Sequence, residues 1–199
     1  MATDDVTHTE DPTCAVAHGT APGGTAGTSG TGSAGTPLDR TLVAVFASPV
    51  SGFLLRYGAD LGFRPLLVEP DAGRAAGSAV GSAPGGFQVL PGVPDDLDES
   101  ADIVVTDHHR DELGVMLRDA LAGKSRWIGV MGNPRHPAPH IPALEALGVA
   151  PGDIARVHRP IGLNIGSRRP AEIAIATLAG LIADRNGRTG GFEFSSAGG

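Results

Sequence analysis

One strand–helix–strand unit constrains the fold of this chain more than any other feature of its sequence. Residues 41–47 form a short run rich in β-branched residues, which predicts a buried strand. Ser48 and Pro49 follow and predict a helix start, because proline has no N–H group to leave unpaired at the first helical position. The helix is expected to end just before Gly62, and residues 64–69 predict a second strand. A unit of this kind, about 30 residues long, is typical of mononucleotide-binding folds.

The rest of the chain continues the alternation of strands and helices. This pattern predicts an α/β fold of the Rossmann-like kind, with one parallel sheet covered by helices on both faces. The last helix is almost entirely apolar, so we expect it to be buried. Strands are expected at 87–90, 101–106 and 126–131, helices at 111–121, 141–148 and 170–184, a helical turn at 153–157, and a loop at 70–86.

Composition divides the chain into a single domain and two tails. Residues 19–36 contain no large apolar side chain, so they cannot bury enough surface to offset the entropy of ordering them. We therefore expect residues 1–38 to be a disordered tail rich in Gly, Thr and Ala, residues 39–185 to be the folded domain, and residues 186–199 to be a flexible tail.

Several classes of protein are disfavoured by the sequence. The N-terminus is acidic without an apolar core, so no signal peptide is expected, and no apolar run reaches the ~18 residues of a membrane span. Cys14 is the only cysteine, which excludes a disulfide framework and a thiolate zinc cluster. These features fit a reducing cytoplasm.

Charge is distributed unevenly along the chain. The net charge is −7, yet residues 126–188 hold eight arginines and four acidic residues. This basic half favours either a phosphate-bearing ligand or an acidic partner, or it is an ordinary solvated surface. We expect no binding to nucleic acid, because the basic residues are not interleaved with aromatic ones.

The first turn after a Rossmann strand normally carries the glycine fingerprint G-x-G-x-x-G. In this chain the three glycine positions fall on Ala47, Pro49 and Gly52. The ring of Pro49 occupies the space through which a pyrophosphate approaches the backbone, which argues against NAD(P) binding. The helix start formed by Ser48, Val50, Ser51 and Gly52 stays a candidate site for a single phosphate, because a helix N-terminus attracts anions.

Other polar residues follow strands at the same predicted edge. Glu69 lies 22 residues after Ala47, where an acid would bind ribose hydroxyls, although acids are common at strand ends. His108 and His109 follow the strand at 101–106. Neighbouring residues of a strand point to opposite sides, so we expect the two histidines not to share a metal ion, and we predict no metal site.

The second half of the chain resembles a known family. The segments that carry the resemblance are W-I-G-V-M-G-N-P-R at 127–135, L-E-A-L-G-V at 144–149, I-A-R-V-H-R-P-I-G-L-N-I-G-S at 154–167 and P-A-E-I-A at 170–174. Their order and spacing are similar to the C-terminal Rossmann domain of the XdhC/CoxI family, which has the run H-x-P-[IV]-G-L-D-I-G-A. Upstream, residues 46–52 lie where the family has F-G-A-G-x-x-G.

The resemblance implies a function in metalloenzyme maturation. Family members are implicated in binding molybdenum cofactor, in promoting its sulfuration and in inserting it into xanthine dehydrogenase or related hydroxylases. The chain is thus expected to handle or present molybdenum cofactor or a nucleotide, or to bind its client, a molybdenum hydroxylase of xanthine or CO dehydrogenase type. A second maturation protein and a homodimer are further expected partners. No catalytic residue is predicted.

The cofactor-binding candidates that the resemblance adds come from the loops of the second half. They are Gly132, Arg135, His158, Gly162, Asn164 and Gly166. Asn164 stands where the family has Asp, and no G-G-C-x-E-like segment precedes the domain. The two later glycines could equally serve tight turns, and the histidine could serve packing.

Two other functions stay open from the residues alone. One is a degenerate Rossmann module that binds a partner without a cofactor. The other is a small NAD(P)-dependent oxidoreductase, which rests on the fold and on Glu69. The chain cannot form a Tyr-x-x-x-Lys pair, because its only tyrosine and lysine are Tyr57 and Lys124.

Overall fold

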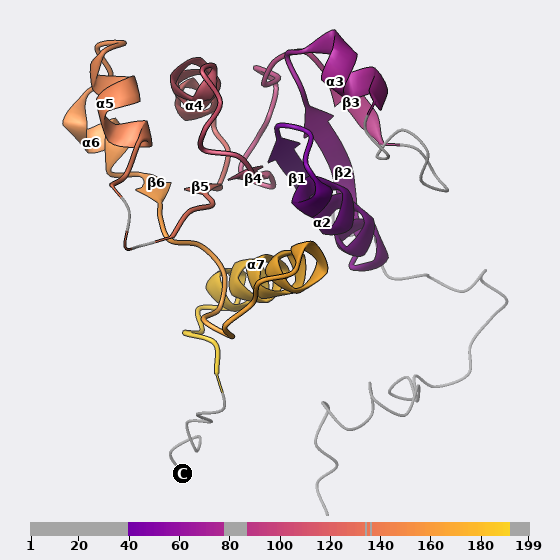
Figure 1. Ribbon diagram of the computed structural model, residues 1–199. Coiled ribbons are helices and arrows are strands. Elements are labelled where there is room, and N and C mark those ends of the chain that lie inside the picture. Colours follow the sequence, from indigo (N-terminus) through magenta and orange to yellow (C-terminus); the bar gives the residue numbers. More distant parts are fainter. Residues whose placement is uncertain (1–39, 78–86, 134, 136, 192–199) are drawn as a thin grey trace, which may run out of the picture. The chain divides into compact units, whose positions relative to one another are not determined.

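The computed structural model describes residues 40–77, 87–133, 135 and 137–191. They form a six-stranded parallel sheet in the order β3-β2-β1-β4-β5-β6, which confirms the predicted Rossmann-like α/β fold. Helices α2 and α7 pack on one face and α4, α5 and α6 on the other (Figure 1). The predicted N-terminal tail, the last eight residues and most of the loop before β3 lie outside the described residues.

The elements follow one another in simple alternation. The strands are β1 (Arg40–Val45), β2 (Phe63–Val68), β3 (Gln88–Leu90), β4 (Asp102–Val105), β5 (Trp127–Val130) and β6 (Val157–His158). The helices are α2 (Pro49–Asp60), α3 (Ala72–Gly77), α4 (Leu113–Ala122), α5 (His140–Glu145), α6 (Pro151–Ile154) and α7 (Pro170–Arg185).

The strand–helix–strand unit forms as its sequence predicts. Ser48 caps α2: its side chain accepts the N–H of Ser51, and the Ser51 hydroxyl accepts the N–H of Ser48. Pro49 occupies the first helical position. Gly62 follows the helix with a φ of +83°, a conformation that glycine adopts without strain. Local signals therefore determine both ends of α2.

Four local expectations were wrong. The loop predicted at 70–86 contains α3, and the helix predicted at 141–148 is only the short α5. The helical turn predicted at 153–157 lies earlier, as α6, and the two-residue strand β6 follows it. Helix α7 is buried only on its sheet-facing side, since Ile175 is 52% exposed. A two-residue strand has no periodicity to detect, and it forms because β5 pairs with it.

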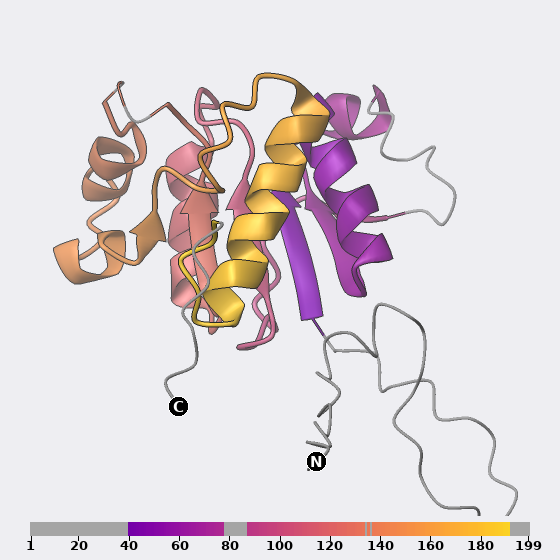
Figure 2. The same ribbon diagram turned by 90° about the horizontal axis from the view of Figure 1, so that it is seen from below.

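An ion-pair network holds α7 against the amino-terminal edge of the sheet. Asp102 is fully buried at the start of β4. It accepts hydrogen bonds from Arg126 at 2.9 Å and from Arg185 at 2.8 Å, and Arg185 also donates to the carbonyl of Ser100. A buried carboxylate is tolerated when it is paired in this way. In Figure 2, α7 crosses the face of the sheet next to α2.

Candidate functional site at the carboxyl edge of the sheet

Strands β1, β2 and β3 follow one another toward one side of the sheet, and β4, β5 and β6 follow one another toward the other. The direction of this progression reverses between the neighbouring strands β1 and β4, which is the topological switch point of the sheet. Ligands of doubly wound sheets bind at the carboxyl ends of the strands beside such a point. In this chain the loops after β1, β2 and β4 meet there and bring together Ser48, Glu69, Thr106 and Arg110. This part of the edge is called the first half below.

The start of α2 is already hydrogen-bonded within the protein. The N–H of Ser51 bonds to the Ser48 hydroxyl, and the N–H of Gly52 bonds to the Ser48 carbonyl. The Ser48 hydroxyl in turn donates to Thr106 Oγ1 at 3.0 Å. Pro49 has no N–H group to offer a phosphate. Among the predicted phosphate-binding residues at this helix start, all of which the structure describes, Val50 alone has an N–H group that is not bonded within the turn. A phosphate would meet few open donors here.

Glu69 sits at the end of β2 with its side chain completely buried. Its carboxylate oxygens accept two hydrogen bonds from Arg110, at 3.0 and 3.1 Å. They also accept the N–H groups of Ala47, at 2.8 Å, and of Asp71, at 2.9 Å. Four donors from the protein therefore occupy the carboxylate that was predicted to bind ribose.

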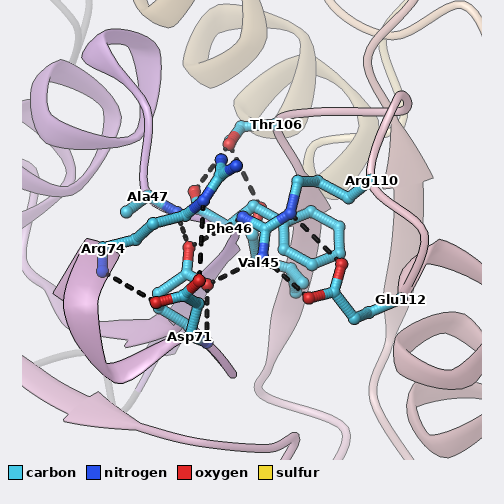
Figure 3. Close-up of polar contacts among 9 residues, drawn as sticks. Val45, Phe46, Ala47, Asp71, Arg74, Thr106, Arg110 and Glu112 are labelled. Carbon is cyan, nitrogen blue, oxygen red and sulfur yellow. Dashed lines mark hydrogen bonds and ion pairs between the residues drawn. The ribbon is translucent and has the colours of Figure 1, made fainter.

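Arg110 lies beside Phe46 and Glu112 in this part of the edge (Figure 3). Its guanidinium lies over the ring of Phe46, 4.6 Å from the centroid, and also pairs with Glu112 at 3.0 Å. Phe46 is fully buried and has a φ of +74°, which strains a bulky residue. Its N–H donates to the carbonyl of Val68, and its own carbonyl accepts the Thr106 hydroxyl at 2.9 Å, so the strained residue is held by β2 on one side and by the loop after β4 on the other.

The charges of this cluster reinforce one another. Burial by itself raises the pKa of Glu69, but the hydrogen bonds from Arg110 and from the N–H groups of Ala47 and Asp71 outweigh burial and hold that pKa below its usual value. The hydrogen bonds to Glu69 and Glu112 raise the pKa of Arg110. Both partners stay charged across the physiological pH range.

The second half of the edge, after β5 and β6, is arranged around Arg159. The Arg159 side chain passes over Gly132, where a Cβ atom would lie 2.7 Å from Arg159 Nε. It donates to the carbonyl of Asn133 at 3.0 Å. Gly132 therefore provides the space through which this cation reaches the loop after β5.

His108 and His109 lie in a turn next to this cation. Their rings are 4.0 Å apart, so the expectation that they point to opposite sides was wrong, because these residues form a turn and not an extended strand. Burial, His109 and Arg159 lower the pKa of His108. No group of three or more potential metal ligands occurs within the described ranges.

A pocket of about 430 Å³ opens between α5, α6 and the end of β6. His140, at the start of α5, and Arg159 line it, together with the side chain of Glu145 and mostly apolar residues. His140 is 4% exposed, and its Nδ1 atom has no hydrogen-bond partner. The lining is thus mostly apolar, with two nitrogen-bearing side chains and the exposed carboxylate of Glu145.

The other predicted site residues lie apart from these groups, except that the N–H of Arg135 donates to Asn133 Oδ1 at 2.9 Å. His158 stacks on Trp127, with ring centroids 5.0 Å apart, and lies within β6. Gly162 has a φ of +82° and packs against the backbone of α7. Arg135, Asn164 and Gly166 are exposed. Their proposed part in cofactor binding stays a prediction.

Sequence reasoning missed the partner of Glu69 and the environment of His140. Arg110 lies 41 residues after Glu69 and carries no signal of its own. His140 is a polar residue at the start of α5, and its position before the apolar residues of this helix was the only sequence signal that pointed to the pocket.

Comparison with known proteins agrees with the geometry. A family model described as the XdhC Rossmann domain matches residues 42–181. The chain is 28% identical over 162 residues to YqeB of Escherichia coli (strain K12), a match that covers 75% of this chain and 28% of YqeB. A Bacillus halodurans protein whose crystal structure is described as that of a xanthine dehydrogenase superposes with a TM-score of 0.60 at 20% identity.

Both relatives are longer than the present chain, and the matches cover only part of their length. The superposition covers 75% of this chain and 45% of the Bacillus halodurans chain. The present chain therefore spans less than half of either relative. At 20% identity, the superposition shows a common fold. No helix within the described residues is long and apolar enough to cross a membrane.

Proposed function

Because the chain belongs to the XdhC family, we propose that it is an accessory protein in the maturation of a molybdenum hydroxylase of xanthine or CO dehydrogenase type. The family match over residues 42–181 is the observation that carries this proposal. The proposed partner is the hydroxylase itself or another maturation protein, and the proposed compartment is the cytoplasm, which a sequence with a single cysteine fits.

The first half of the edge does not fit a dinucleotide. Pro49 lacks the N–H that a pyrophosphate needs, the N–H of Ser51 is capped, and Glu69 is fully paired with Arg110 and backbone donors. A ribose would have to displace a bidentate ion pair with a buried carboxylate. These contacts argue against the oxidoreductase alternative and support a role in binding.

The described residues do not fit molybdenum either. Thiolates are the soft ligands suited to the molybdenum side of the cofactor, and Cys14, the only cysteine, lies outside the described residues. We therefore propose that this domain binds the client or a second maturation protein, and that the partner contributes the groups that hold the metal.

The proposal is tested by deleting the gene and measuring molybdenum-hydroxylase activity in the host. We expect a large loss of activity per unit of hydroxylase protein, restored when the full-length chain is supplied again. Pull-down with the tagged full-length chain should recover the hydroxylase or a maturation partner. Unchanged activity after deletion would overturn the accessory function.

The second candidate function is a degenerate binding module without any role in cofactor delivery, which the closed first half of the edge favours. Under this alternative the partner is still recovered in the pull-down. The hydroxylase purified from the deletion strain would then carry a normal content of sulfurated cofactor. The accessory proposal requires that content to fall.

A further inference from the structure

An apolar groove of about 410 Å³ lies between α2 and α7, which pack side by side on one face of the sheet (Figure 2). Its lining includes Tyr57, Asp60 and Leu61 from the end of α2 and Ile175, Ala179 and Ile182 from α7. Apart from Asp60 and the tyrosine hydroxyl, these side chains are apolar. Leu61 is 47% exposed and Ile175 is 52% exposed, so large apolar side chains reach solvent on both sides of the groove. Exposed apolar surface that is concentrated in this way is typical of a protein interface.

The outer face of α2 adds an aromatic and cationic stripe beside the groove. Phe53, Arg56, Tyr57 and Asp60 are spaced three and four residues apart, which places them on one face of the helix. The guanidinium of Arg56 lies over the rings of Phe53 and Tyr57, 4.8 and 5.1 Å from their centroids. Aromatic residues and arginine are enriched at the centres of protein interfaces. Because the rings hold Arg56 in place, its side chain loses little conformational freedom on binding.

Asp60 carries a charge that its own helix does not compensate. It is the last residue of α2, where the helix dipole is negative, and the last turn contains no basic residue. In the part of the chain that the structure describes, neither the Asp60 carboxylate nor the Arg56 guanidinium forms an ion pair or a hydrogen bond. Both side chains are exposed. A cation from outside the chain would therefore stabilise the end of α2, and an anion would suit Arg56.

We propose that this groove is the interface between two copies of the chain, related by a two-fold axis that sets their α2 helices antiparallel. In a two-fold interface each contact occurs twice with the partners exchanged, so the surface must be self-complementary. Arg56 and Asp60 meet this condition. They lie about 6 Å apart along the helix, and antiparallel alignment brings Arg56 of each copy opposite Asp60 of the other.

The charges also favour a second copy over a different protein. An acidic or a basic partner would satisfy one of the two charges and repel the other, whereas the same stripe turned by the two-fold axis satisfies both. Leu61 and Ile175 of each copy are then buried against the apolar walls of the other. This proposal goes beyond the accessory function and does not depend on it.

Sedimentation equilibrium of the full-length chain, without any client enzyme, tests the proposal. We expect the parent to dimerise at concentrations up to about 100 µM. Ile175→Glu should raise the dimer dissociation constant at least about tenfold, because it buries a carboxylate without a partner twice in each dimer. Ile165→Glu is the matched control. Ile165 is 56% exposed but lies in the loop before α7, away from the groove, so its variant should change the constant less than about twofold.

Charge reversal tests the antiparallel arrangement. Arg56→Asp and Asp60→Arg each bring like charges together at two places and should raise the dissociation constant at least about tenfold. The double variant Arg56→Asp/Asp60→Arg restores opposite charges and should dimerise at least about fivefold more tightly than either single variant. Arg118→Asp on α4 changes the net charge as much as Arg56→Asp and should have less than about a twofold effect.

Three results would each overturn the proposal. They are a parent that stays monomeric at about 100 µM, a dimer that tolerates Ile175→Glu and both reversals, and a double variant no tighter than the single ones. A monomeric parent whose Ile175→Glu variant loses the hydroxylase in pull-down would assign the groove to that protein and leave the accessory function standing. Since the substituted side chains are exposed, each variant should keep the circular dichroism of the parent, which separates lost association from lost folding.

Discussion

At the first half of the carboxyl edge, Glu69 is buried with four donors from the protein, whereas at the second half His140 is buried with its Nδ1 atom unpaired. Both halves lie on one parallel sheet, and both contain an arginine that crosses a loop. Arg110 is used to satisfy a carboxylate of the same chain, and Arg159 lines a pocket of about 430 Å³. The fold alone therefore does not determine where a ligand can bind.

This difference between the two halves coincides with the altered glycine fingerprint after β1, where Pro49 stands at the second glycine position. In the half that contains Pro49, the protein's own groups take the positions where a nucleotide would hydrogen-bond. In the other half, a glycine, Gly132, gives an arginine access to the loop after β5. One edge of a single sheet thus has internally paired polar groups at one half and a pocket at the other.

The largest effect is expected from Arg110→Ala. The variant leaves the Glu69 carboxylate buried without its ion pair, and breaking a buried pair in this way costs about 3–5 kcal/mol of unfolding free energy. Urea unfolding followed by circular dichroism measures the loss. Arg118→Ala is the control, because Arg118 pairs with Asp119 on the surface and should change stability by less than about 1 kcal/mol. Equal losses would mean that the first half is not closed by this pair.

A pair of glycine variants comes next and tests whether the H-x-P-I-G-L-x-I-G run serves packing. In Gly162→Ala the new Cβ atom would lie 3.1 Å from the backbone of Ala176 and Thr177, and φ is +82°. We expect a loss of roughly 2–4 kcal/mol from strain and overpacking together. Gly166 has a φ of +67° but open space around it, so Gly166→Ala should lose only about 1 kcal/mol. Equal losses in thermal or urea unfolding would remove the packing explanation.

A lower pH should reduce the free energy of unfolding, and part of this loss should come from protonation of Glu69. Its pKa in the folded chain lies below the ordinary value of 4.5, so its contribution to stability is complete above that pH and is lost as pH falls through the folded pKa. The effect should be smaller than that of Arg110→Ala, because a protonated Glu69 still accepts hydrogen bonds. Urea unfolding at a series of pH values should show a shallower acid loss for Glu69→Gln than for the parent. Parallel curves would contradict this assignment.

The smallest effect is expected from Pro49→Gly. Greater freedom of the unfolded chain should lower stability by roughly 1 kcal/mol. NADH should raise the melting temperature of neither the variant nor the parent, because Glu69 and Ser51 stay bonded within the protein. A ligand at 100 times its Kd adds about 2.7 kcal/mol, which thermal shift detects easily. A shift in the variant alone would show that proline, and not the ion pair, closes this half.

Much of the fold could be predicted because its signals are local. The run at 41–47, the Ser48–Pro49 cap and Gly62 act within a few residues and fixed β1 and α2 in advance. Strand β6 could not be found, since two residues have no pattern and depend on pairing with β5.

The site was less predictable for the same physical reason. Glu69 was identified from its spacing, but its availability depends on Arg110, a contact across 41 positions that no local pattern encodes. His108 and His109 were misplaced because the chain turns directly after β4. Side-chain pairing across loops is a tertiary property, and one sequence does not reveal it.

The anchoring of α7 also bears on where a self-sufficient domain ends. Similarity to the family stops at residue 181, but Arg185, one of the two arginines bound to the buried Asp102, lies four positions later. A chain that ended at residue 181 would keep the whole segment that matches the family. It would nevertheless remove Arg185, one of the two partners of the buried Asp102 at the amino-terminal edge of the sheet. Expression limits for this fold are therefore better chosen from the last buried ion pair than from the last recognisable residue.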